Sequence, residues 1–234
     1  MNQDPQVARI EELEAENRRL RRFLDETGLP AELRHKVRNT LSMLRAIIRR
    51  SAETSVSLET YVAHLDGRLD ALARVLNALM RSVPEGIGLH SLVADELLVH
   101  LAREGEQIAI SGPSLRFRPG SAEVFAMAVH ELAVNAVEHG ALTVPQGRIH
   151  VTWSLSPPTG QSGSQPLLTF IWEESGLEDI PPTPPHRGFG FEVLERSLRY
   201  ELKAETDLDF RPQGLRCTIS LPLQAQITVV DDEE

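Results

Sequence analysis

The sequence predicts an α+β protein in which a helical hairpin precedes a sheet that is covered on one face by helices. Two stretches, residues 31–51 and 58–80, carry apolar residues at spacings of three and four, the period of an amphipathic helix. A short segment rich in helix breakers follows at residues 82–86. Beyond it, strand-like runs mix with helical ones without a strict strand–helix–strand order. These observations predict a helical part followed by a mixed part.

The composition is that of a globular protein and limits the function classes. The chain has 234 residues, a formal net charge of −10 and a single cysteine. No apolar run approaches the ~20 residues of a membrane span, and no signal peptide opens the chain, so we expect a cytoplasmic protein without membrane insertion. The negative charge argues against a nucleic-acid partner bound by phosphate neutralisation. Cys217 lies in an alternating strand pattern and is expected in the core.

Residues 1–27 form the first predicted segment, an N-terminal coiled-coil or signalling helix. Residues 6–26 contain neither Gly nor Pro, and alternating steps of three and four place one seam along the helix. The seam residues are Ile10, Leu13, Asn17, Leu20 and Leu24. Asn17 takes a position where a polar side chain fixes register. The alternative is a single amphipathic helix that lies on the rest of the chain.

Residues 28–83 are predicted to form the hairpin. Gly28 suits the end of one helix, and Pro30 suits the first turn of the next. Two amphipathic helices joined by a short loop cannot bury both apolar stripes unaided. Pairing with a second copy would complete a four-helix bundle, so the sequence predicts a homodimer.

Residues 88–224 are predicted to form the mixed α+β domain, with residues 225–234 as an acidic tail. The tail also resembles the first strand and acidic turn of a receiver domain, and an ordinary tail is the simpler interpretation. Helices are expected at residues 89–103, 122–139 and 191–202, and strands at 107–111, 148–154, 167–173, 204–210 and 215–221.

Within the predicted helix 122–139, Glu131 and Asn135 stand four residues apart and project from one face. A carboxylate and an amide oxygen held in this way form half of a site for a hard cation that carries phosphates, because Mg²⁺ prefers oxygen ligands. Gly140 is expected to end the helix in a left-handed conformation. The alternative is an ordinary solvated face that includes His139.

Two glycine-containing segments could complete a nucleotide site. The strand 167–173 leads into Glu174 and Gly176, where a carboxylate could accept a hydrogen bond from an exocyclic amine and the glycine would permit close approach of a flat ring. Gly188 and Gly190 precede a helix and could offer amide hydrogens to a phosphate. A plain strand exit and a tight turn are the alternatives. The proline-rich loop 177–187 between them is a candidate lid.

His35 is the candidate nucleophile in the hairpin. It lies in the first turns of a helix among Arg34, Lys36 and Arg38, which would attract an incoming phosphate. An imidazole is largely neutral near pH 7, so a nitrogen lone pair is available. Asn39, four residues on, could orient the ring. The alternative is a surface histidine without a chemical role.

Taken together and in this order, these segments resemble the HWE family of bacterial sensor histidine kinases, which is related to the HisKA-2 group. The family is named for a histidine in a nucleotide-binding helix, the N box, and for a Trp-x-Glu element; these would be His130 and Trp172 to Glu174. The resemblance extends from about Leu33 to Leu223. It implies a dimerisation and histidine-phosphotransfer hairpin followed by a Bergerat-type (GHKL) ATP-binding α/β sandwich.

The resemblance also implies roles for single residues. His35 would accept the γ-phosphoryl group of ATP, with Asn39 beside it and Glu131 assisting proton handling. Asn135 would be a ligand of Mg²⁺, and Glu174 would take the place of an adenine-binding aspartate. The remaining nucleotide-binding positions would be His139, Trp172, Gly176, Gly188 and Gly190.

The predicted function is therefore that of a two-component histidine kinase. It would use ATP and Mg²⁺ to phosphorylate itself on His35 and pass the phosphoryl group to an aspartate of a response-regulator receiver domain. An upstream sensory partner would act on the N-terminal helix. Glu138 and Leu177 replace a lysine and a glycine common in the family, which motivates an alternative, a non-catalytic phosphotransfer or scaffold protein. An ATPase or an anti-sigma-type Ser/Thr kinase would leave the hairpin and His35 unexplained.

Overall fold

The chain folds into two compact units, Met1–Asp70 and Ala71–Glu234, each of which is described by itself. The computed structural model describes residues 5–26, 31–55, 57–82, 86–99, 107–157, 166–178, 188–223 and 227–229. The division between the units falls within one helix, α3 (Leu58–Ser82). The domain limits expected from the sequence stay predictions.

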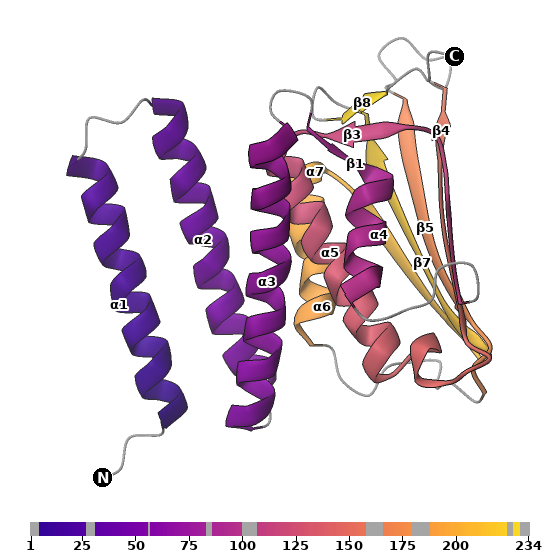
Figure 1. The fold of residues 1–234 in the computed structure, drawn as a ribbon, viewed down its shortest axis with the longest axis horizontal. Helices are drawn as coiled ribbons and strands as arrows, with labels where there is room; N and C mark the ends of the chain where they lie inside the picture. The colour runs from indigo at the N-terminus through magenta and orange to yellow at the C-terminus, as the bar shows by residue number, and fades with distance from the viewer. Residues whose placement is uncertain are drawn as a thin grey trace. The chain divides into compact units, whose positions relative to one another are not determined.

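The first unit consists of α1 (Pro5–Glu26), α2 (Ala31–Thr54) and the first half of α3 (Figure 1). Ser57 caps α3, because its hydroxyl accepts a hydrogen bond from the Thr60 N–H at 3.1 Å. Apolar residues from the predicted stripes are buried here: Leu41, Ile47, Ile48, Tyr61 and Leu65. The two predicted hairpin helices are confirmed.

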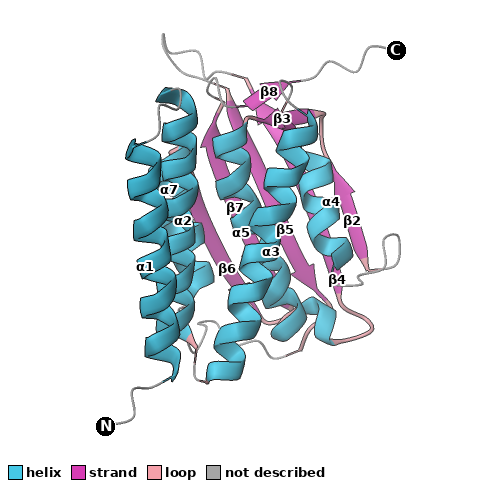
Figure 2. Cartoon of the chain, turned by 60° about the vertical axis from the view of Figure 1, so that its left-hand side comes forward, coloured by secondary structure: helices cyan, strands magenta, loops and turns pink. Residues whose placement is uncertain are grey.

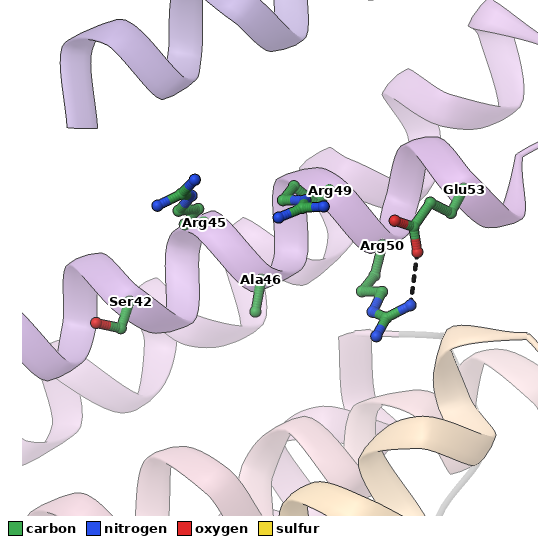
Figure 3. A pocket seen from close by; sticks show the side chains of 6 residues that line it. All are labelled: Ser42, Arg45, Ala46, Arg49, Arg50 and Glu53. Carbon is green, nitrogen blue, oxygen red and sulfur yellow. Dashed lines mark hydrogen bonds and ion pairs between the residues drawn. The ribbon is translucent and has the colours of Figure 1, made fainter. Parts of the chain in front are cut away.

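The seam of α1 packs on α2 within the same chain. Asn17 is buried, and its side-chain Nδ2 donates to the Leu41 carbonyl at 2.8 Å. Glu14 lies 3.7 Å from Arg45 on the same pair of helices. Asn17 therefore forms its hydrogen bond with α2 of the same chain. A coiled coil between the N-terminal helices of two copies stays a prediction. A shallow pocket lies further along α2 (Figure 3). Its lining residues are Ser42, Arg45, Ala46, Arg49, Arg50 and Glu53.

The second unit is built on two sheets (Figure 1). The larger sheet has the order β2 (Ile108–Ser111), β4 (Arg148–Ser156), β5 (Leu167–Ser175), β7 (Gly214–Pro222) and β6 (Glu205–Arg211). Its β2–β4 pair is parallel, and its other pairs are antiparallel. The smaller sheet joins β1 (Ile87–Gly88), β3 (Leu115–Phe117) and β8 (Ile227–Val229). The structure therefore places three residues of the expected tail in a strand, with Ile227 buried.

Helices α4 (Leu89–Val99), α5 (Pro119–Glu138) and α7 (Leu198–Leu202) lie over one face of the larger sheet (Figure 2). Short turns complete the layer: η1 (Ala141–Thr143), α6 (Phe189–Glu192) and the π-helical η2 (Val193–Ser197), which leads into α7. Phe125 of α5 packs on Phe117 and Phe170, at centroid distances of 4.8 and 5.1 Å. The α+β fold class is confirmed.

The opposite face of the larger sheet is polar. On the edge strand β6, Glu205, Asp207 and Asp209 are exposed and alternate with less exposed residues. On β5, Glu173 lies 3.5 Å from Arg216 of β7. Cys217 is fully buried, as expected, and burial raises the pKa of its thiol. Within the described residues, the structure has no helix that is both long and apolar enough to cross a membrane.

Candidate functional site

The middle of α5 presents the predicted carboxylate–amide pair to the glycine segment at α6. A Cβ built on Gly190 would lie 3.3 Å from the Glu131 carboxylate oxygen Oε2 and 3.3 Å from Asn135 Nδ2. Glu131 is buried and Asn135 is half-buried. The structure therefore brings together three predicted site residues from two separate segments, and a side chain at position 190 would crowd the pair.

The carboxylate of Glu174 is held near the end of α5. Glu174 lies at the end of β5 and is 4% exposed. Its Oε1 accepts a hydrogen bond from Trp172 Nε1 at 3.0 Å, and its Oε2 accepts one from the Ala141 N–H at 2.8 Å. Trp172 is fully buried, and its hydrogen bond orients the Glu174 carboxylate. We call Trp172, Glu174, Gly140 and Ala141 the Glu174 cradle.

Gly140 is needed in this cradle for space. Its φ is −115°, an extended conformation, so the left-handed helix end expected from the sequence is wrong. A Cβ at this position would overlap the Glu174 carboxylate and lie 2.8 Å from the Ala136 Cα. The absent side chain of Gly140 lets the end of α5 approach β5.

Gly176 has both a conformational and a steric reason to be glycine. Its φ is +85°, a region that other residues rarely adopt. A Cβ there would also lie 2.6 Å from the Gln146 carbonyl oxygen. Gly176 thus closes the turn after Glu174, whereas a contact between Gly176 and a nucleotide stays a prediction.

Glu174 should make the stability of the protein depend on pH. Burial raises the pKa of its carboxyl above the ordinary 4.5, although the hydrogen bonds from Ala141 and Trp172 oppose that shift. The folded state then binds the proton more tightly than the unfolded state, so this contribution to stability is present below pH 4.5 and is lost as the pH rises through the raised pKa. We expect the free energy of unfolding of the unmodified protein to fall over this range relative to that of Glu174→Gln. Urea unfolding of both proteins between about pH 4 and pH 8 measures the difference, and parallel curves would contradict it.

The remaining predicted positions are placed as follows. His139 caps the end of α5 and is largely exposed, with Nε2 3.7 Å from Glu138 Oε2. Gly188 precedes α6, with open space where a Cβ would stand. His35 and Asn39 belong to α2 in the first unit; Asn39 is exposed, and the side chain of His35 lies outside the described part of the structure. The candidate lid is described only at residues 177 and 178; the rest of it, residues 179–187, also lies outside the described part.

A buried polar chain on the other side of α5 was missed by the sequence analysis. His130 Nδ1 lies 2.7 Å from Glu96 Oε1, and Arg74 Nη2 donates to Glu96 Oε2 at 2.6 Å. The resemblance named His130 but gave it no partner. Charged residues at positions 74 and 96 of otherwise apolar helix faces were the available signal.

Comparisons with known proteins find similar histidine kinases. The profile of the HWE histidine kinase family matches residues 32–114. Blue-light-activated histidine kinase 1 of Erythrobacter litoralis is 29% identical over 199 residues, which are 83% of this chain and 53% of the relative. The chain is therefore similar to HWE histidine kinases. A blue-light-activated histidine kinase of Brucella ovis is 27% identical over 196 residues, which are 84% of this chain and 39% of that relative.

Solved structures agree on the fold. The histidine kinase domain of a blue-light activated histidine kinase from Erythrobacter litoralis has a TM-score of 0.54 at 19% identity, with 94% of this chain and 96% of that domain covered. A longer chain of the same kinase also gives 0.54, at 22% identity, with 84% of the present chain and 63% of the longer one covered. The present chain spans about half the length of blue-light-activated histidine kinase 1 of Erythrobacter litoralis.

Proposed function

We propose that this protein belongs to the HWE histidine kinase family and is a two-component histidine kinase that uses ATP to phosphorylate itself on His35 and then passes the phosphoryl group to an aspartate of a response-regulator receiver domain. The observation that carries the proposal is the close approach of Gly190 to Glu131 and Asn135. This approach gives a backbone-lined face with a carboxylate and an amide, in a chain that is similar to HWE histidine kinases over residues 32–114. We further propose that it works as a homodimer and receives its signal from an upstream sensory partner.

The residues of this face fit Mg²⁺ bound together with a polyphosphate. Among the described residues, no cluster of three or more His, Cys, Asp or Glu side chains could hold a metal. A single amide ligand from the protein would leave most coordination positions of Mg²⁺ open for phosphate and water oxygens. The side-chain amide oxygen of Asn135 would serve as the metal ligand. When bound, the ion would neutralise charge on the phosphates.

The Glu174 cradle would bind the adenine. Each carboxylate oxygen has two lone pairs, and the structure uses one on each oxygen for Trp172 and Ala141. A second lone pair can accept a hydrogen bond from the exocyclic amine of the base. Gly176 and Gly140 keep the neighbouring backbone free of side chains. Trp172 therefore contributes through Glu174 and not by direct contact.

The chemical step needs few reactive groups. A nitrogen of His35 would attack the γ-phosphorus, the bond from that phosphorus to the β–γ bridging oxygen would break, and ADP would leave. Glu131 would take up the proton released by the imidazole, and Asn39 would orient the ring. Because His35 belongs to the first unit and the nucleotide-binding residues belong to the second, the two units must meet for transfer, within one chain or between two copies.

The two departures from the family pattern fit an active enzyme. Glu138 is half exposed, so its charge is screened by solvent, and its Oε2 lies 3.7 Å from His139 Nε2. Leu177 sits in the turn after Gly176, where its N–H donates to the Gln213 carbonyl at 3.2 Å. Leucine is accommodated at this position through its backbone. These contacts support the kinase over the non-catalytic scaffold.

Calorimetry with a non-hydrolysable ATP analogue and Mg²⁺ tests the nucleotide site. We expect micromolar binding, and we expect Asn135→Ala to weaken it at least about tenfold because a metal ligand is lost. Val137→Ala, on an exposed part of the same helix, is the matched control and should bind like the unmodified protein. An absence of binding heat, together with phosphoryl acceptance from a phosphorylated regulator, would support the scaffold alternative instead.

A further inference from the structure

A buried chain of three polar side chains connects α3, α4 and α5 in the second unit. Glu96 of α4 uses its two carboxylate oxygens for different helices: Oε2 accepts from Arg74 of α3 at 2.6 Å, and Oε1 meets His130 of α5 at 2.7 Å. Glu96 is 5% exposed and His130 is 3% exposed. Arg74 is partly accessible.

A contribution to folding stability does not by itself explain why these three polar side chains are buried together. The free energy needed to remove charged groups from water offsets much of their mutual attraction. Apolar side chains of similar volume often stabilise a core equally well. Geometry is a better reason, since hydrogen bonds to both oxygens of one carboxylate fix the distance and the direction of two neighbouring helices. The Arg74–Glu96–His130 chain is thus suited to setting the position of α5.

The position of α5 matters because His130 is followed directly by Glu131. Consecutive residues of a helix are turned by about 100°, so a bond that holds His130 toward α4 also fixes where Glu131 and Asn135 point. At a side-chain radius of about 5 Å, a rotation of roughly 10° moves these groups by about 1 Å. A displacement of that size can lower a rate about 100-fold.

We propose that Glu96 and His130 are positioning residues for phosphoryl transfer and that Arg74 anchors them to α3. They hold α5 in the rotation that sets Glu131 and Asn135 against Gly190. Arg74 lies in the part of α3 that belongs to the second unit, so all three polar side chains lie within that unit. The effect on transfer rests on the proposed kinase function, whereas the effect on α5 does not.

The first experiment uses the full chain without nucleotide. Glu96→Gln should speed amide hydrogen exchange at residues 131–138 at least about tenfold while β5 and β7 keep their protection. Glu53→Gln is the matched control, because Glu53 also pairs with an arginine, Arg50, at 2.6 Å but on the exposed surface of α2 (Figure 3). It should leave residues 131–138 unchanged. Unchanged exchange in Glu96→Gln would overturn the proposal whether or not the protein is a kinase.

The second experiment separates positioning from folding. A variant with Arg74→Met, Glu96→Leu and His130→Leu replaces the chain by apolar groups and should unfold at a temperature similar to that of the unmodified protein. We expect its kcat for autophosphorylation to fall at least about 30-fold, with the KM for ATP changed less than about threefold. A kcat like that of the unmodified protein would overturn the proposal. If the unmodified protein takes up no label, the kinase assignment fails, and the exchange experiment alone decides the positioning role.

Discussion

Replacing His35 by alanine should abolish the phosphoryl label that the chain takes up from γ-labelled ATP. The label on the unmodified protein should be labile in acid and stable in alkali, because a phosphorus–nitrogen bond to an imidazole breaks on protonation. Alanine offers no nucleophile, and it is the best helix former, so α2 keeps its structure. Gel autoradiography after acid and alkali treatment measures the loss, which should be complete within detection.

His90→Ala is the control for this experiment. His90 is an exposed residue of α4 whose ring lies 6.4 Å from that of Trp153, and it has no place in the proposed reaction. This variant should label like the unmodified protein. Label that persists in His35→Ala would refute the assignment of His35, and an acid-stable label would favour a Ser/Thr kinase.

Gly140→Ala should disrupt the Glu174 cradle and cost about 3 kcal/mol of folding stability. Alanine adopts the extended backbone of this position readily, so the loss comes from the added methyl group, which would overlap the Glu174 carboxylate and crowd the Ala136 backbone. Relieving the overlap must separate the end of α5 from β5. Urea unfolding measures the stability, and calorimetry should show loss of binding of the ATP analogue.

Gly120→Ala provides the comparison within the same helix. Gly120 stands in the first turn of α5, and a Cβ there would meet no atom within 4 Å. Alanine should therefore be neutral or stabilise by up to about 1 kcal/mol, through helix propensity and a less flexible unfolded chain. If Gly140→Ala were as stable as Gly120→Ala, the cradle would not be packed as described.

The long elements could be predicted from the sequence because their periodicity is local. The helices of the hairpin, α5 and the five strands of the larger sheet follow apolar patterns of three to four or of two residues. The strands β1 and β3 were missed, and the residues of β8 were assigned to an acidic tail, since two or three residues carry no period and their pairing is decided by distant parts of the chain. The π-helical turn in the predicted helix 191–202 has no sequence signal of its own.

The candidate site could be predicted where one short segment holds the chemistry. The spacing of Glu131 and Asn135 indicated a shared face, and the structure confirms that both lie beside Gly190. Spacing could not reveal that Glu96 and Arg74 meet His130, because these contacts join three helices. Nor could it reveal why position 140 is glycine, because the reason is a carboxylate that belongs to another strand.

The acidic outer stripe of β6 has a consequence for how copies of this protein can associate. A free edge of a sheet offers backbone groups to any matching strand, and two such edges in register would extend the sheet across both molecules. Here the joining would set Glu205, Asp207 and Asp209 against the same residues of the second copy, and like charges facing each other across strands are unfavourable. The carboxylates therefore disfavour self-association of the protein through the β6 edge of the sheet.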